Sequence, residues 1–161
     1  MKKLIIYGNG KIAKTLYQYV KNKYDVVAFT VDNSFITKKK HLKIPIIPLD
    51  EVAYSYSPSN HLMLCAVGYI NMNAVREKKY KELKEMGFTF TNYIHESVYI
   101  HDDLVIGDNN IILENVSIQP GVSIGNSNFF WSNVVLGHGS IIGDTNWIAS
   151  GSVLGGDCKL K

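Results

Sequence analysis

The stretch IGDNNI at residues 106–111 returns as IGNSNF at 124–129 and as IGDTNW at 142–147. Each copy begins eighteen residues after the one before it. A strict period of six lies inside this longer period, because every sixth residue is large and apolar: Ile100, Ile106, Ile112, Ile118, Ile124, Phe130, Leu136, Ile142, Ile148, Leu154 and Leu160. An α-helix, with a period of about 3.6, and a β-strand, with a period of about 2, do not produce this spacing.

A period of six is typical of a parallel β-helix, in which short strands wrap around one shared core. Three hexads in each eighteen-residue period predict a triangular coil, and successive coils should stack roughly 4.8 Å apart. Like side chains of successive coils then form ladders, in which amides can hydrogen-bond along the stack. We expect two such ladders, Gly107–Gly125–Gly143 and Asn110–Asn128–Asn146.

The charge distribution divides the chain into two parts. Residues 1–93 carry fifteen Lys or Arg against seven Asp or Glu, whereas residues 94–161 carry two against seven. Two domains with different surfaces explain this asymmetry better than one domain does. A chain of 161 residues with 46% hydrophobic content is also long and apolar enough to bury a core. We therefore predict a first domain over residues 1–94 and a second over residues 95–161.

The composition argues against several classes of protein. KKKHLK (38–43) is basic but lacks interleaved aromatic residues, so it favours a solvated face, or attraction for a phosphorylated small molecule, over nucleic-acid binding. No apolar run approaches the roughly 20 residues of a membrane span, and the start MKKLIIYGNG lacks a signal-peptide cleavage pattern. Cys65 and Cys158 make no disulfide framework, so we expect two reduced cysteines in a cytoplasmic protein.

Strand and helix signals alternate in the first half of the chain. We expect strands over residues 3–7, 25–32, 44–48 and 62–68, helices over 12–21 and 73–87, and a helical turn after Pro48. Gly87 should cap the second helix, and residues 88–94 should lead into the coils. Such alternation predicts an α/β domain, a small parallel sheet with helices on its faces.

GNGKIA (8–13) follows the first expected strand and opens the first helix. Gly8, Gly10 and Ala13 form a G-x-G-x-x-A arrangement, whose glycines let the backbone approach phosphate oxygens at a helix N-terminus. Asp32 ends the second strand, where a carboxylate can accept a hydrogen bond from a ribose or a base. This motif fits NAD as readily as a sugar nucleotide, and it also fits glycines that are needed only for a tight turn.

The combination resembles the bacterial sugar-nucleotide acyltransferases, a family that includes sialic acid O-acetyltransferases and N-acetyltransferases of UDP- or dTDP-linked 4-amino-sugars. The resemblance covers nearly the whole chain and rests on YGNGKIA (7–13), VDNS (31–34), AVGYINMNAVREKKY (66–80), YIHES (93–97), ILENVSIQPGVSIGN (112–126) and WSNVVLGHGSIIGD (131–144). It implies a Rossmann-like domain followed by a left-handed parallel β-helix of hexapeptide repeats, assembled as a homotrimer. The implied reaction is acetyl transfer from acetyl-CoA to an amine or hydroxyl of a nucleotide-linked amino-sugar, in bacterial surface glycan biosynthesis and without a metal.

The same resemblance makes His138 the candidate general base. His138 stands two residues after Leu136, which should point inward, and so lies at a coil edge. In the resembled family, the histidine before such an IGD segment accepts the proton of the sugar amine or hydroxyl that attacks the thioester. An imidazole, with an ordinary pKa of about 6.5, is largely neutral at pH 7 and can accept that proton. From its position alone, His138 could equally be an exposed histidine of the coil edge.

The remaining site residues are also implied by the resemblance. The amide of Gly156, one coil after His138, would donate to the thioester carbonyl and so contact the co-substrate, although a glycine there could simply permit the corner. The nucleotide would be held by Gly8, Gly10, Lys11, Asp32, Asn33 and Gly68. Lys11 could also be a solvated lysine of the first helical turn, and Gly68 could merely end a strand.

Two features depart from the resembled family. Many relatives have a polar or acidic residue after the histidine, whereas this chain has Gly139. The sequence also stops at GGDCKLK, inside a hexad, whereas relatives continue for further coils that complete the groove for CoA. We therefore expect a β-helix that is truncated at its C-terminus.

Other classes of protein explain fewer of these features. A β-helix carbonic anhydrase needs three histidines around zinc, and only His138 of His41, His61, His95, His101 and His138 lies well inside the coils. A nucleotide- or NAD-binding regulatory protein would use GNGKIA but would leave the β-helix unexplained. A structural trimerisation module without transferase activity would need the coils but not the histidine.

Overall fold

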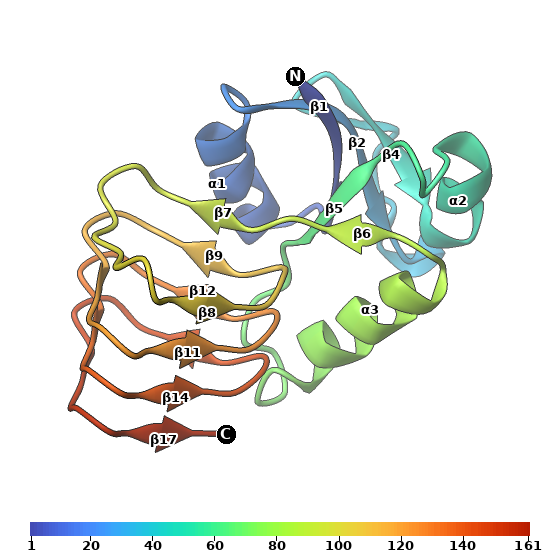
Figure 1. Cartoon of the computed structure of the whole chain (residues 1–161). Coiled ribbons are helices and arrows are strands. Elements are labelled where there is room, and N and C mark those ends of the chain that lie inside the picture. Colours follow the sequence, from blue (N-terminus) through green and yellow to red (C-terminus); the bar gives the residue numbers. More distant parts are fainter. The chain divides into compact units, whose positions relative to one another are not determined.

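The computed structural model describes residues 1–161 and divides into two compact units, Met1–Thr91 and Asn92–Lys161 (Figure 1). Tyr93 and Ile94, which the sequence analysis placed at the end of the first domain, form strand β7 (Tyr93–Ile94) and pair with Ile111 and Ile112 of the coils. None of the helices combines the length and the apolar character that a membrane span requires.

Unit 1 is built on a six-stranded sheet with the order β3-β4-β2-β1-β5-β6. The strands are β1 (Lys2–Tyr7), β2 (Tyr24–Val31), β3 (Lys40–His41), β4 (Ile44–Pro48), β5 (Leu62–Cys65) and β6 (Thr89–Phe90). All neighbours are parallel except β3 and β4, which are antiparallel. The four predicted strands are therefore confirmed, whereas the edge strands β3 and β6 were not predicted, because two residues show no periodicity.

Helices cover both faces of this sheet. They are α1 (Lys11–Val20), α2 (Val52–Ser55) and α3 (Ala74–Glu85), with 3₁₀ turns η1 (Asn33–Phe35) and η2 (Leu49–Glu51). One face of β1 and β5, with Ile5 and Met63, packs against Val52 of α2 and Leu83 of α3. Side chains alternate along a strand, so the buried residues on either side of Ile5 in β1 point to the other face of the sheet. Helix α1 lies on that side (Figure 1). Gly87 follows α3 with φ +90°, as predicted for its cap.

Unit 2 is a stack of two-residue parallel strands, from β7 to β17. The further strands are β8 (Val105–Ile106), β9 (Ile111–Ile112), β10 (Ser117–Ile118), β11 (Ser123–Ile124), β12 (Phe129–Phe130), β13 (Val135–Leu136), β14 (Ile141–Ile142), β15 (Trp147–Ile148), β16 (Val153–Leu154) and β17 (Lys159–Leu160). They form three sheets, β10-β13-β16, β17-β14-β11-β8 and β15-β12-β9-β7. Ser123 pairs with Val105 and with Ile141, eighteen residues away on either side, as the repeat predicted. This stacking is consistent with a left-handed parallel β-helix.

The second residue of each strand points into the coils. Ile112, Phe130 and Leu136 are completely buried in one core with their counterparts in neighbouring strands. Ile100, with which the apolar series begins, is 37% exposed and does not belong to this core. The hexad pattern therefore extends further along the sequence than the core does.

From residue 109 onward, each coil corner has one residue with a left-handed backbone. These residues recur every six positions, with φ between +56° and +75°: Asn109, Asn115, Gly121, Ser127, Asn133, Gly139, Thr145, Gly151 and Asp157. Glycine and asparagine adopt this conformation most readily, which explains their frequency in the repeat.

The predicted asparagine ladder runs inside the stack. Asn110 Oδ1 accepts the backbone N–H of Asn128 at 3.0 Å, and Asn128 Oδ1 accepts that of Asn146 at 2.7 Å. Asn128 Nδ2 also donates to the carbonyl of Gly143 at 2.9 Å. The glycine ladder is confirmed as well, since a Cβ on Gly125 would lie 2.9 Å from the carbonyl carbon of Gly143.

Candidate functional site

The GNGKIA loop joins β1 to α1 at the carboxyl end of the sheet. Gly8 has φ +122°, its N–H donates to the carbonyl of Thr30 at 2.8 Å, and a Cβ there would lie 2.9 Å from the carbonyl oxygen of Ala66. Gly8 is therefore required by the fold itself. Gly10 differs, because a Cβ at this position would meet no atom within 4 Å. The space beside Gly10 is open to a ligand.

Lys11 and Gly68 lie beside the same loop. Lys11 is the first residue of α1 and is exposed, and the first turn of α1 contains no acidic residue. Gly68 follows β5, and a Cβ there would lie 3.8 Å from the side chain of Ile12. The structure thus brings Gly8, Gly10, Lys11 and Gly68 together around an uncompensated helix N-terminus, an arrangement suited to an anion.

Asp32 lies at the end of β2, as predicted, but it already has partners. Its Oδ2 accepts from the Tyr7 hydroxyl at 2.8 Å, and its Oδ1 is 2.5 Å from Lys79 Nζ. Lys79 also pairs with Glu82 at 2.8 Å and is only 12% exposed. Lys79, which reaches Asp32 from α3, was not predicted as a site residue. The only sign of it in the sequence is a lysine three residues before Glu82 in a helix.

These contacts change the protonation of the cluster. Burial raises the pKa of Asp32, but the hydrogen bonds from Lys79 and Tyr7 outweigh burial and leave that pKa below its ordinary value. Burial lowers the pKa of Lys79, but its bonds to Asp32 and Glu82 leave that pKa above its ordinary value. Burial, followed by the bond to Asp32, raises the pKa of Tyr7. The cluster therefore holds Asp32 as a carboxylate and Lys79 as an ammonium ion.

A cavity of about 400 Å³ lies next to Asp32. It is lined by Asp32, Asn33, Ser34, Leu49, Asp50, Glu82 and Met86. Asn33 does not face this cavity freely, because its Nδ2 donates to Asp50 Oδ2 at 3.1 Å. Three carboxylates make the cavity unfavourable for phosphates and suitable for a ligand that presents hydrogen-bond donors, such as the hydroxyls of a ribose.

His138 lies at the corner after β13, and two neighbouring coils bind its backbone. Its N–H donates to Gln119 Oε1 of the preceding coil at 2.8 Å. Its carbonyl accepts the N–H of Asp157 of the following coil at 2.7 Å. The side chain is exposed, and neither ring nitrogen makes a hydrogen bond within the chain. Both nitrogens are thus available to a substrate.

The imidazole of His138 lies directly against the backbone of Gly156. A Cβ on Gly156 would lie 2.5 Å from both Cε1 and Nε2 of the ring, so only glycine permits this ring position. Gly139 is restricted in a similar way, because a Cβ there would lie 2.4 Å from Asp157 Oδ1. A carboxylate from the next coil therefore occupies the place where a side chain of residue 139 would begin.

The backbone N–H of Gly156 is left free. No hydrogen bond within the chain engages it, and Gly156 is exposed. Gly156 lies one coil after His138, whose N–H donates to the side chain of Gln119. One coil after Gln119 lies Gly137, which has no side chain and so cannot accept the N–H of Gly156 in the same way. An unengaged N–H and an unengaged imidazole thus lie at one corner.

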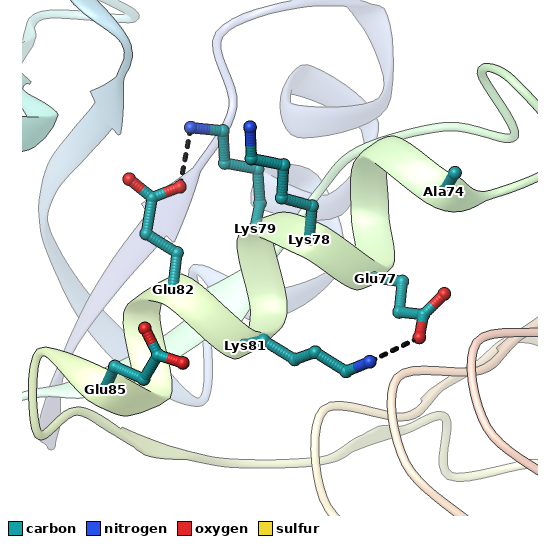
Figure 2. A pocket seen from close by; sticks show the side chains of 7 residues that line it. All are labelled: Ala74, Glu77, Lys78, Lys79, Lys81, Glu82 and Glu85. Atoms are coloured by element: carbon teal, nitrogen blue, oxygen red, sulfur yellow. Dashed lines mark hydrogen bonds and ion pairs between the residues drawn. The ribbon is translucent and has the colours of Figure 1, made fainter.

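Helix α3 has a groove that contains none of the predicted site residues. The groove, of about 510 Å³, is lined by Ala74, Glu77, Lys78, Lys79, Lys81, Glu82 and Glu85 (Figure 2). Lys81 and Glu77 are paired across it, as are Lys79 and Glu82. It is the charged face of one helix, and its charges largely satisfy one another.

Nowhere in the structure do three or more metal-ligating side chains gather to hold a metal ion.

Comparisons with known proteins agree with this architecture. Residues 103–138 match the family model for the bacterial transferase hexapeptide (six repeats). No curated protein sequence matches the chain. Among solved structures, a mutant of perosamine N-acetyltransferase from Caulobacter crescentus, in complex with CoA and GDP-perosamine, is similar with a TM-score of 0.86 and 19% identity, over 99% of this chain and 74% of that chain.

Two further structures show the same similarity. The acetyltransferase domain of PglB from Neisseria gonorrhoeae has a TM-score of 0.83 and 18% identity, over 99% of this chain and 76% of that one. WeeI from Acinetobacter baumannii has a TM-score of 0.81 and 16% identity, over 99% of this chain and 74% of that one. The chain therefore has the fold of these proteins, and its residues 103–138 are hexapeptide repeats of the bacterial transferase type.

Proposed function

We propose that this protein transfers the acetyl group of acetyl-CoA to an amine or hydroxyl of a nucleotide-linked sugar. The observation that carries the proposal is the corner at which the unengaged imidazole of His138 lies against Gly156, whose N–H is also unengaged. Similar structures support it, since one is a perosamine N-acetyltransferase with CoA and GDP-perosamine and another is an acetyltransferase domain with acetyl coenzyme A.

In the proposed reaction His138 acts as general base. The sugar amine attacks the thioester carbonyl carbon while His138 accepts the proton of that amine, so that the new C–N bond forms and the carbonyl opens to a tetrahedral intermediate. The C–S bond breaks when this intermediate collapses and the carbonyl forms again. The same proton can pass from the imidazole to the departing thiolate, which leaves as CoA. The free N–H of Gly156 donates to the carbonyl oxygen while that oxygen carries negative charge in the tetrahedral intermediate.

Unit 1 is proposed to hold the nucleotide. The open space at Gly10, the N-terminus of α1 and Lys11 suit the phosphates, with Gly8 and Gly68 keeping the loop in place. The cavity beside Asp32 and Asn33 suits the nucleoside, whose hydroxyls can donate to the carboxylates. Lys79 and Tyr7 keep Asp32 ionised for this purpose.

A homotrimer is proposed for the assembly. The coils expose outward apolar side chains on two of their sheets, with Val105 68%, Ile141 48% and Val153 73% exposed. Burying such side chains between subunits would be favourable. We place the reaction in the cytoplasm because acetyl-CoA and nucleotide sugars are intracellular metabolites.

The test is incubation of the protein with acetyl-CoA and a panel of nucleotide-linked 4-amino-sugars. Release of free CoA thiol should depend on one of the sugars, and mass spectrometry should find one added acetyl group on that sugar. His138→Asn serves as the matched inactive variant. If no sugar nucleotide in the panel is acetylated, the proposed function is wrong.

A further inference from the structure

The orientation of the exposed His138 imidazole must come from its surroundings, because hydrogen bonds of the ring do not fix it. The imidazole of His138 makes no hydrogen bond within the chain, so its direction depends on the backbone that carries it and on its contact with Gly156. That backbone has two polar attachments: the N–H to Gln119 Oε1, at 2.8 Å, and the carbonyl to the N–H of Asp157, at 2.7 Å. Of these, only the bond to Gln119 depends on a side chain.

Gln119 is well suited to this contact. A backbone N–H can only donate, so the contact with His138 fixes which end of the Gln119 amide is the carbonyl and turns its NH₂ group away. The backbone of Gln119 is itself fixed, since its N–H donates to the carbonyl of Leu136 at 3.0 Å. The side chain thus ties the corner of His138 back to the strand that precedes it.

We infer that Gln119 is a positioning residue for His138, one that holds the general base at the angle required for proton transfer. This inference rests on the proposed function. Gln119 acts through the backbone of His138 and not on the substrate, so its loss should reduce the rate of the chemical step more than substrate binding.

A similar contact elsewhere in the coils provides the control. Ser97 Oγ accepts the backbone N–H of Asn115 at 2.9 Å, also one coil away and also exposed. Ser97→Ala removes a cap of the same kind at a corner without His138. If capping serves only the stability of the coils, Ser97→Ala and Gln119→Ala should have the same effects.

The experiment compares wild type, Gln119→Ala, Gln119→Glu and Ser97→Ala in two measurements. Hydrogen–deuterium exchange at the His138 amide reports the bond directly: exchange should be roughly tenfold faster in Gln119→Ala and close to wild type in Gln119→Glu, which keeps an acceptor oxygen. Steady-state kinetics should show kcat reduced roughly tenfold in Gln119→Ala, with KM for both substrates within about twofold.

Gln119→Glu should change the pH–rate profile, which a purely structural role of Gln119 would leave unchanged. Its kcat should recover above neutral pH, and the acid side of its pH–rate profile should move to higher pH, because the new negative charge on residue 119 favours the protonated form of the imidazole. Ser97→Ala should leave kcat unchanged.

Each contrary result has a separate meaning. Wild-type kcat in Gln119→Ala would overturn the inference and leave the proposed function intact. An equal loss in Ser97→Ala, or a rise in KM alone for Gln119→Ala, would also overturn it, in favour of coil stability or of substrate binding. If wild type acetylates no sugar nucleotide, the proposed function fails and the positioning role fails with it, whatever the exchange shows.

Discussion

The His138 imidazole is exposed, yet its surroundings leave it little freedom. Gln119 and Asp157 bind its backbone, and the backbone of Gly156 lies under its ring. A general base needs this combination, since the ring nitrogens must reach a substrate while the ring stays in one orientation.

Gly156→Ala tests whether the ring position matters. The new methyl group would lie 2.5 Å from Nε2 and Cε1 of His138, so the ring must move while the backbone N–H of residue 156 remains. We expect kcat to fall roughly 10- to 100-fold, measured as thiol release from acetyl-CoA. Gly155→Ala is the control, because a Cβ there meets no atom within 4 Å, and it should remain active. Full activity in Gly156→Ala would mean that the observed ring position is not the productive one.

The ion pair of Asp32 can be tested through the stability of the protein. Asp32→Asn removes the charge that pairs with Lys79 in a site where the side chains are only 30% and 12% exposed. We expect the free energy of unfolding at pH 7 to fall by about 1–2 kcal/mol in denaturant titrations. Glu77→Gln breaks the exposed pair with Lys81 and should change this free energy by less than about 0.5 kcal/mol.

The pH dependence of this difference has a definite sign. The pKa of Asp32 in the folded protein lies below its ordinary value of 3.8, so the carboxylate stabilises the fold fully above that value. The stabilisation is lost as the pH falls through the folded pKa. The gap between wild type and Asp32→Asn should therefore be constant near neutral pH and close in acid. A gap that does not change in acid would show that the charge of Asp32 is not its source.

Among the elements, the asparagine ladder connects the coils most directly. Asn128 is 1% exposed, and its amide binds Asn110, Asn146 and Gly143. Because Asn128 is buried, replacing its amide removes the acceptor of the Asn146 N–H and the donor to the carbonyl of Gly143.

Asn128→Leu should therefore cost about 2–4 kcal/mol of unfolding free energy, although it adds apolar volume to the coil interior. The measurement is the shift of the denaturant midpoint at constant slope. Ser123→Ala, on the outward side of β11, should change the stability by less than about 0.5 kcal/mol. A stable Asn128→Leu variant would show that packing, and not the ladder, holds the coils together.

The repeat was readable from the sequence because each coil repeats the same local contacts. A residue eighteen positions away is a neighbour, so the Asn and Gly ladders follow from spacing alone. The edge strand β3 was not predictable, since Lys40 and His41 carry no pattern and pair only because β4 offers a free edge. Ile100 shows the opposite case, because it obeys the repeat but is 37% exposed and does not join the core.

The candidate site was only partly predictable, for a different reason. The positions of Gly8, Gly10 and Asp32 follow from the order of strands and helices, since the loops of a parallel sheet meet at its carboxyl edge. The contact between Lys79 and Asp32 joins residues 47 positions apart, which belong to α3 and to the end of β2. The cap from Gln119 to His138 spans nineteen positions, one more than the repeat, and so breaks the ladder pattern that would have revealed it.

The identity of the nucleotide ligand separates acetyl transfer from regulatory nucleotide binding as the function of the protein. If unit 1 serves acetyl transfer, calorimetry should show that a nucleoside diphosphate sugar binds more tightly than NAD. The cavity beside Asp32 and the open loop at Gly10 together suit one nucleoside and its phosphates. Tighter binding of NAD would favour the regulatory nucleotide-binding function instead.

In the proposed reaction, His138 removes the proton from the attacking group. The most direct measurement is kcat of His138→Asn in the acetyl-CoA assay, with the sugar nucleotide that wild type accepts. Asparagine keeps hydrogen bonding but cannot accept a full proton, so kcat should fall roughly 10²–10⁴-fold, or about 3–5 kcal/mol, with little change in sugar-nucleotide affinity. Normal acetyl transfer by His138→Asn would contradict this role, because His138 would then be only an exposed residue of the coil corner.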